Sequence, residues 1–198
     1  MLKLMTDPIA PLGAKPLSLN DSQEYYAAAM TYLGKSIKAG SIISSLNGCN
    51  WDVWVYITAE MEPCFMEYEF CIQHNVPASL AIWCPTGKIT AAIEGVPTLQ
   101  SPAIGLLHEL GHAAQWVNNR GWYLAYMDKI RAGDPAKKGT PAYNSKMVVE
   151  NDNIDSNETP VCVELGEGKR NNYNDSYNFQ AASKNYKAPY PLRQGGVI

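Results

Sequence analysis

Hydrophobic and polar residues follow patterns that change along the chain. Residues 51–58 are dense in β-branched and aromatic side chains, which predicts a strand. Residues 80–84 and 88–93 flank Pro85-Thr86-Gly87 and predict a β-hairpin. A helical pattern ends at residue 33, near Gly34, and Asn20 with Gln23 predicts its capped start. A second helical pattern starts at Ser101-Pro102 and ends near residue 117, since Ser caps a helix and Pro fits its first turn.

The flanking segments complete the expected organisation. Residues 142–166 predict another helix, with Pro160 as a candidate kink, and the chain from Asn171 onward is expected to be irregular. Residues 1–20, with Pro8, Pro11 and Gly13, are expected to form a linker-like arm. Residues 21–198 then form one α+β domain, because a chain of 198 residues fits a single domain.

Composition narrows the classes of partner. The formal net charge is -3 and no basic run is visible, which argues against nucleic acid as a partner. No apolar stretch is long enough for membrane insertion, and Asp7 and Pro8 interrupt the apolar start, so no cleavable signal peptide is expected. The five cysteines form no C-x-x-C pair. They are compatible either with two disulfides and a single Cys162 or with buried thiols.

The residues that point to chemistry are His108-Glu109-Leu110-Gly111-His112. Histidines four residues apart on a helix leave the same face, where both rings can bind one zinc ion. Glu109 is placed to take a proton from water on that metal and to pass it to a leaving group. Two of the three histidines of the chain lie in this motif, and its helix is apolar over much of its circumference, as expected of a buried active-site helix. We therefore expect a zinc-dependent hydrolase with one zinc ion.

A catalytic zinc site needs a third protein ligand and an open position. The downstream segment offers Glu150 and Glu158, while Asp152 and Asp155 have a shorter reach. The residues alone do not decide which of the two glutamates is the third ligand. The other one is expected to orient a ligand histidine. His74 could approach the metal, but a lone histidine of this kind is more often structural.

A resemblance makes the expectation more specific. The motif at 108–112, then Glu158-Thr159-Pro160, then the E-L-G-x-x-x-R-x-x-Y block at 164–173 resemble the NleD-like type III effector metallopeptidases. They are similar also to peptidase domains fused to type VI secretion spike and Rhs proteins, and more loosely to clostridial neurotoxin light chains. The resemblance covers about 75 residues, roughly residues 100–175.

The resemblance implies a zincin-like fold: a small β-sheet, an active-site helix and a second helix that carries the glutamate. It implies His108 and His112 as ligands, Glu109 as base and Glu158 as third ligand. Arg170 and Tyr173 match the pair that would hydrogen-bond the oxyanion, although a surface Arg and a packed Tyr are the plainer interpretation.

The expected function is peptide-bond hydrolysis by a secreted toxin or effector that a bacterial secretion system delivers. Its expected partners are a protein or peptide substrate, a secretion-system carrier protein and an immunity protein. The place of action would be the periplasm of a target cell or the cytosol of a host. The alternatives are another zinc hydrolase, such as a cell-wall amidase, and a non-catalytic interaction module that keeps zinc for stability.

Overall fold

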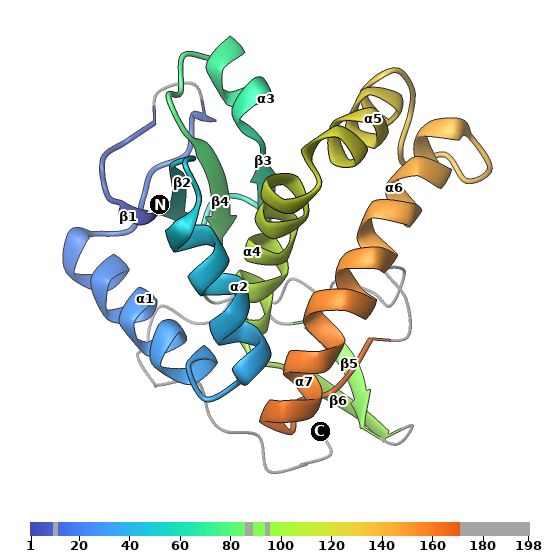
Figure 1. The fold of residues 1–198 in the computed structure, drawn as a ribbon. Coiled ribbons are helices and arrows are strands. Elements are labelled where there is room, and N and C mark those ends of the chain that lie inside the picture. Colours follow the sequence, from blue (N-terminus) through green and yellow to red (C-terminus); the bar gives the residue numbers. More distant parts are fainter. Residues whose placement is uncertain (10–11, 86–88, 94–95, 171–198) are drawn as a thin grey trace.

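The computed structural model describes residues 1–9, 12–85, 89–93 and 96–170, which form an α+β fold with a small mixed sheet (Figure 1). The strands are β1 (Leu2–Met5), β2 (Val53–Ile57), β3 (Cys64–Met66), β4 (Ser79–Trp83), β5 (Ile89–Ile93) and β6 (Val96–Gln100). The helices are α1 (Leu19–Leu33), α2 (Ile37–Gly48), α3 (Tyr68–Gln73), α4 (Pro102–Asn118), α5 (Arg120–Arg131), α6 (Pro141–Asn153) and α7 (Thr159–Leu165). A π-helical turn, Ile154–Glu158, joins α6 to α7.

The main sheet has four strands in the order β1-β2-β4-β3. β1, β2 and β4 are parallel, whereas β3 is an edge strand that pairs antiparallel with β4. β5 and β6 form a separate two-stranded ribbon. The short edge strand β3 follows β2 by a connection of only a few residues and lies against α4, so it borders the centre of the molecule.

Alternating side chains of the sheet belong to two hydrophobic cores, one on each face. Val55 and Ile57 of β2 belong to the larger core, which the sheet shares with α1, α2, α4 and α7. Tyr56, between them, faces the smaller core on the opposite side, together with Leu80 and Ile82 of β4. Since successive side chains of a strand point to opposite faces, a strand covered on both sides must be apolar at nearly every position. This explains the unbroken hydrophobic run that marked β2 in the sequence.

α4 is the central helix of the fold. It packs against β4 and β3 on one side and against α1, α2, α5 and α6 on the others (Figure 1). Every residue from Pro102 to Trp116 is buried, because other elements of the fold cover the helix on all sides. The polar residues of this helix are therefore held out of bulk water by the elements around them.

Several sequence-based expectations are confirmed. The strand at 51–58, the helix ending at residue 33 and the helix from residue 102 are all present, although Ser18 and not Asn20 caps α1. The stretch 142–166 is helical and is interrupted just before Pro160 by the π-helical turn.

Two expectations are wrong. β4 does not form a hairpin with β5: it pairs with β2 and β3, and β5 pairs with β6. Residues 2–5 are not a linker, because they form β1 and pair in parallel with β2. Ala14 is also held against the sheet, since the Tyr56 hydroxyl donates a 2.7 Å hydrogen bond to its carbonyl.

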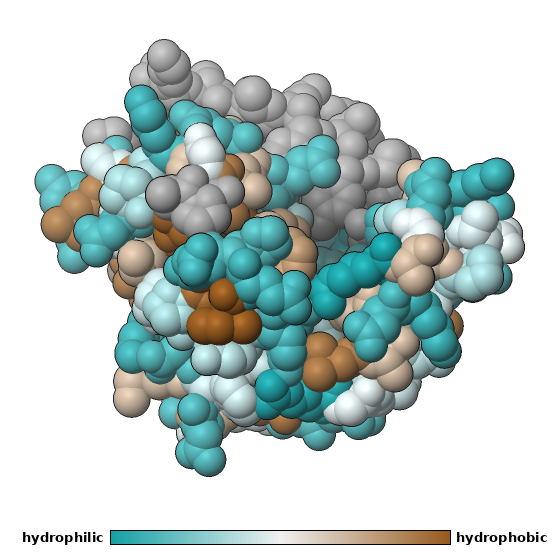
Figure 2. All heavy atoms as spheres, turned by 90° about the horizontal axis from the view of Figure 1, so that it is seen from above, coloured by the Kyte–Doolittle hydropathy of each residue, from teal (hydrophilic) through white to brown (hydrophobic). Residues whose placement is uncertain are grey.

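The surface shows no broad apolar area in the view of Figure 2, where hydrophobic residues appear as small separate patches among hydrophilic ones. Scattered apolar side chains of this kind are ordinary for a folded protein. None of the helices in the described part of the chain combines the length and apolarity that a membrane-spanning segment needs. All five cysteines are free thiols, so the alternative of two disulfides is not what the structure shows.

Candidate metal centre

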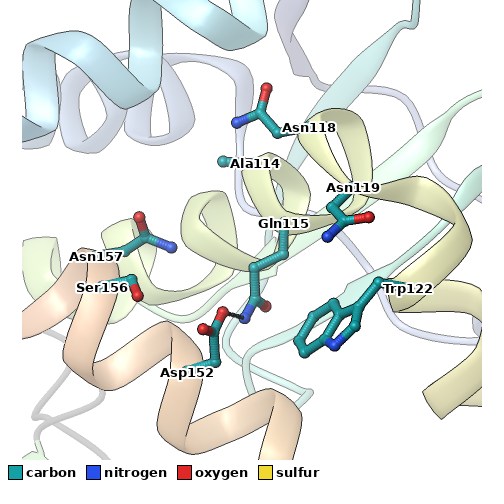
Figure 3. A pocket seen from close by; sticks show the side chains of 8 residues that line it. All are labelled: Ala114, Gln115, Asn118, Asn119, Trp122, Asp152, Ser156 and Asn157. Atoms are coloured by element: carbon teal, nitrogen blue, oxygen red, sulfur yellow. Dashed lines mark hydrogen bonds between the residues drawn. The ribbon is translucent and has the colours of Figure 1, made fainter.

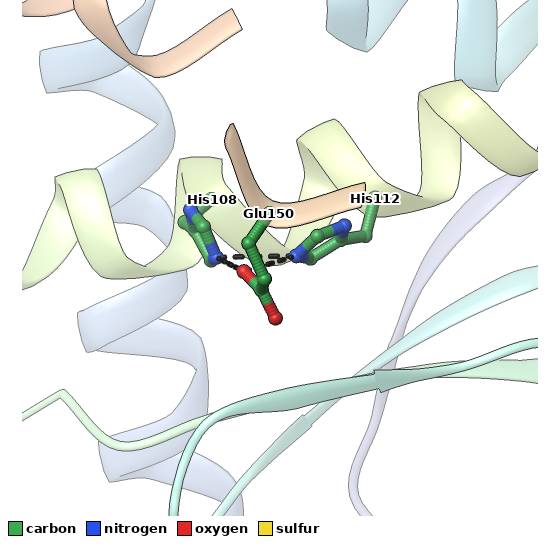
Figure 4. A group of neighbouring side chains, drawn as sticks. All are labelled: His108, His112 and Glu150. Atoms are coloured by element: carbon green, nitrogen blue, oxygen red, sulfur yellow. Dashed lines mark hydrogen bonds and ion pairs between the residues drawn. The ribbon is translucent and has the colours of Figure 1, made fainter. Parts of the chain in front are cut away.

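His108 and His112 of α4 meet Glu150 of α6 (Figure 4). The two Nε2 atoms are 3.1 Å apart. Oε2 of Glu150 lies 3.1 Å from Nε2 of His108 and 3.2 Å from Nε2 of His112. The three donor atoms therefore form a nearly equilateral triangle, which we call the ligand triangle.

Hydrogen bonding alone does not explain the ligand triangle. A hydrogen bond needs one proton roughly on the line between its two heavy atoms, and an Nε2 that carries a proton cannot also accept one. Whichever edges carry protons, at least one edge of the triangle is left without one. Ligands of tetrahedral zinc at ~2.0 Å are about 3.3 Å apart, close to the three edges seen here. Two imidazoles and one carboxylate are also a donor set that zinc favours, so these residues fit the ion.

The side chain of Gln115 orients His112. Nδ1 of His112 is 2.8 Å from Oε1 of Gln115. The amide nitrogen of Gln115 donates to the carbonyl of Val149 at 3.0 Å and to Oδ2 of Asp152 at 2.7 Å, which fixes which end of the amide faces the imidazole. Because Oε1 accepts the Nδ1 proton, the lone pair of Nε2 is left to point into the triangle.

Glu158 has the same function for His108. Its Oε2 lies 2.9 Å from Nδ1 of His108, on the side of the ring away from the triangle. Arg170 holds this carboxylate with a 2.8 Å bond from Nε to Oε1 and a second bond from its terminal nitrogen to Oε2. Gln100 donates to the same Oε1 at 2.8 Å. A buried carboxylate with this many donors is a fixed acceptor. In the tautomer that donates the Nδ1 proton to it, the lone pair of the His108 Nε2 points into the triangle.

The π-helical turn brings both glutamates to His108. In a regular α-helix, residues eight apart such as Glu150 and Glu158 differ by about 80° around the axis. The wider turn at 154–158 rotates the chain less per residue and takes up that difference. Glu150 therefore reaches Nε2 of His108 while Glu158 reaches Nδ1 of the same ring. π-turns within helices are frequent at functional sites, and this one has a definable geometric consequence.

The charges of the cluster suit a cation. Burial acts to lower the pKa of His108, but hydrogen bonds to Glu150 and Glu158 outweigh it and raise that pKa to about 10. Burial raises the pKa of Glu109. Metal binding requires both imidazoles to be neutral, and in that state Glu109, Glu150 and Glu158 against Arg170 would give the cluster a formal charge of -2. A divalent cation balances this charge, which is costly to keep buried otherwise.

Gly111 lies between the two ligand histidines because α6 passes very close to α4 there. A Cβ on Gly111 would be 2.1 Å from Oδ1 of Asn153. Asn153 cannot easily move away, since its Nδ2 donates to the carbonyl of His108 at 2.8 Å and its Oδ1 accepts from Asn157 at 3.0 Å. The space beside Gly111 is filled by the side chain of Asn153, which holds α4 and α6 together.

Replacing Gly111 by alanine is therefore expected to lower the free energy of unfolding by about 1–3 kcal/mol, the typical cost of overpacking a tight contact. Gly105 provides the matched control, because it is also buried in α4 and a Cβ there would meet nothing within 4 Å. Gly105→Ala is expected to be neutral or stabilising by up to ~1 kcal/mol. Urea denaturation of the two variants measures both effects, and equal effects would contradict this account of Gly111.

The ligand triangle opens into a cleft of about 490 Å³. Its walls are α4, the segment around β3, α5 and α6, and it includes Glu109 beside the two histidines. Within the described part of the chain, no hydrogen bond holds the carboxylate of Glu109, and its oxygens are not among the polar atoms sealed from solvent without a partner. The carboxylate therefore faces the cleft, where a water molecule or a substrate is its partner.

A second depression, of about 320 Å³, lies on the other side of Gln115 (Figure 3). It is lined mainly by amide and hydroxyl side chains, and Trp122 forms one wall. Figure 3 shows the amide of Gln115 pointing toward Asp152, the contact that keeps its oxygen on His112. The hydrogen-bond chain that orients the metal ligand thus ends at the protein surface.

The structure brings together most of the predicted site residues, but the two glutamates have each other's expected positions. His108, His112 and Glu109 share the cleft as expected. Glu150 and not Glu158 completes the ligand triangle, whereas Glu158 has the orienting contact expected of the other glutamate. The contacts of Arg170 are with Glu158 and with Nδ1 of His108, at 2.9 Å, on the side of the ring away from the triangle.

Two further candidates lie elsewhere. Tyr173 is outside the described residues, so its expected contact with the oxyanion stays a prediction. His74 packs against Phe70 with ring centroids 4.5 Å apart and lines a small apolar pocket with Leu12 and Leu80, apart from the ligand triangle. Two aromatic residues of the strands, Tyr56 and Trp83, are fully buried.

The sequence did not indicate the polar residues that orient the ligands. Gln115 follows His112 by three residues, a spacing that places both on one helix face, and this signal was available. No local sequence signal pointed to Gln100 or Asn153, because their contacts join segments about 45 to 70 residues apart in the sequence.

Comparisons with protein-family models, with curated proteins and with solved structures returned no match for this chain. The site is therefore interpreted from its own geometry.

Proposed function

We propose that this protein is a zinc-dependent metallopeptidase whose zinc ligands are His108, His112 and Glu150. The observation that carries the proposal is the ligand triangle with Glu109 beside it, open to a cleft. Zinc held there would polarise a substrate carbonyl and lower the pKa of a water to about 7. The remaining chemistry belongs to the side chains of the chain.

Glu109 is the proton carrier in this proposal. Its carboxylate takes a proton from the attacking water and returns it to the nitrogen of the leaving amine, so one residue serves as base and then as acid. Its burial and its lack of a hydrogen-bond partner in the described chain keep it available for that proton. Gln115 and Glu158 hold the imidazoles in the tautomer that leaves both Nε2 lone pairs on the metal side.

The edge strand β3 supports a peptide as the substrate. Among the described residues β3 pairs only with β4, so its other edge has backbone groups available for an extended chain. Cys64 and Phe65 of this strand line the same cleft as Glu109. An extended peptide that adds to such an edge gains main-chain hydrogen bonds regardless of its sequence. The cleft thus offers a place for a polypeptide next to the reacting groups.

A substrate panel tests this proposal. Zinc-loaded protein is incubated with unstructured proteins, with a peptide mixture and with cell-wall muropeptides, and mass spectrometry identifies the products. We expect cleavage within the proteins and peptides, and none with His112→Ala. Cleavage of muropeptides alone would contradict a peptidase and support the cell-wall amidase. Absence of cleavage with every substrate would contradict an enzymatic function.

The biological part of the proposal is that the enzyme is a delivered effector or toxin, with a carrier and an immunity protein as partners. It rests on the motif at 108–112 and the block at 164–173. Expression of the wild type in the bacterial periplasm or in a host cytosol is expected to arrest growth, whereas Glu109→Gln is expected to be harmless. Equal toxicity of both proteins would contradict a role of hydrolysis in toxicity.

A further inference from the structure

Tyr123 lines the cleft and packs against the edge strand β3. It belongs to α5, which follows α4 directly, and its side chain is 2% exposed. Its ring centroid is 6.5 Å from that of His112 and 6.1 Å from that of Phe65 on β3. The phenol is therefore held between the ligand helix and the strand that borders the cleft, with little freedom to turn away.

The hydroxyl of Tyr123 has no partner within the described part of the chain. Buried tyrosine hydroxyls normally find one, because an unpaired polar group is costly in the interior. The oxygen is also not among the sealed polar atoms that lack a partner, so it is in contact with the cleft, which Tyr123 lines together with Glu109 and Glu150. A nearly buried donor thus faces the space that the substrate would fill.

Tyr32 shows what a structural tyrosine looks like in this protein. It is 5% exposed, and its hydroxyl donates a 2.7 Å hydrogen bond to Oε1 of Glu167. The other oxygen of Glu167 accepts from the backbone nitrogen of Ser101, at the start of α4. The hydroxyl of Tyr32 thus has its hydrogen-bond partner within the fold, and Tyr32 is not one of the residues that line the cleft. Tyr123 has comparable burial and no such internal partner.

We propose that Tyr123 is a catalytic residue whose hydroxyl donates a hydrogen bond to the carbonyl oxygen of the bound peptide. The role rests on the proposed peptidase function. A phenol keeps its proton at neutral pH and can therefore donate to an oxygen on which negative charge develops. A donor that is fixed in advance in a site with little water stabilises that charge without reorganising. Neither the sequence motif nor the resemblance points to α5.

The test compares zinc-loaded wild type, Tyr123→Phe and Tyr32→Phe. Turnover of a cleaved peptide gives kcat and KM. Calorimetry gives the Kd of a peptidyl phosphonamidate, which has the tetrahedral shape of the transition state. Denaturation gives stability. We expect Tyr123→Phe to lower kcat by about 10²–10³-fold, the loss typical of one oxyanion donor. The phosphonamidate should bind at least ~10-fold more weakly, with zinc content and melting temperature unchanged.

Tyr32→Phe should show the opposite profile, a lower melting temperature with kcat unchanged. Loss of stability in Tyr123→Phe with unchanged kcat and unchanged Kd would make Tyr123 structural and overturn the inference. In a wild type that cleaves peptides, this result leaves the peptidase function intact. The binding measurement needs no turnover, so unchanged Kd overturns the role also in a protein without detectable cleavage. A wild type that neither cleaves nor binds would contradict the proposed function and with it this role.

Discussion

Glu150→Gln is expected to abolish tight zinc binding, whereas the matched change Glu158→Gln is expected to weaken it and keep one site per chain. An amide oxygen is a poor substitute for the carboxylate oxygen that lies 3.1–3.2 Å from both Nε2 atoms. At Glu158 the amide oxygen can still accept the Nδ1 proton of His108, so the orientation and basicity of one ligand are weakened but not lost, although Arg170 loses its buried counter-charge. Loss of such an orienting partner costs about 10–100-fold in metal affinity.

Competition with a chromophoric chelator measures both affinities, and circular dichroism establishes that each variant is folded. Glutamine is the better replacement at Glu158. Both changes remove the carboxylate charge beside the buried guanidinium of Arg170, but the amide oxygen of glutamine can still accept a hydrogen bond, whereas alanine leaves no side-chain acceptor. Zinc retained by Glu150→Gln at wild-type affinity, together with loss in Glu158→Gln, would return the third ligand to Glu158.

The second large effect is expected from Glu109→Gln, which should lower kcat by about 10²–10⁴-fold, the usual contribution of a positioned acid–base group. Zinc content and stability should stay near those of the wild type, since Glu109 is not part of the ligand triangle and no hydrogen bond holds its side chain within the described chain. Peptide turnover and elemental analysis of the same preparation measure both quantities.

Glu62 provides the control for charge. It lines the same cleft and is exposed, so Glu62→Gln removes one negative charge without removing the proton carrier. Its effect on kcat is expected to be within a few-fold, as for other surface charges in water. Equal losses in Glu62→Gln and Glu109→Gln would show that the field of the cleft, and not proton transfer by Glu109, governs the rate.

The central helix was predictable because its signals are local. The spacing of His108 and His112 and the Ser101-Pro102 opening lie within one segment. α4 begins at Pro102 as expected, although the side chain of Ser101 makes no capping hydrogen bond. The sheet was less accessible, since β4 inserts between β2 and β3 through pairings that no local pattern encodes. The missed strand β6 contains Pro97, a residue that argues against a strand unless it lies at an edge.

The third ligand was open for a geometric reason. Glu150 and Glu158 are both carboxylates downstream of the motif, and a regular helix would place them about 80° apart around its axis. The π-helical turn at Ile154–Glu158 changes that angle, and the sequence Ile-Asp-Ser-Asn-Glu contains no pattern that predicts such a turn. The close contact of Gly111 with Asn153 could not be predicted either, because only the packing of α6 on α4 reveals that partner.

The most direct test of the metal centre is an anomalous difference map from crystals of the zinc-loaded protein, with data collected on both sides of the zinc absorption edge. We expect one peak per chain, within bonding distance of Nε2 of His108, Nε2 of His112 and a carboxylate oxygen of Glu150, with Glu158 remaining on Nδ1 of His108. A peak bonded to Glu158 in place of Glu150, or no peak between the histidines, would contradict the proposed zinc site.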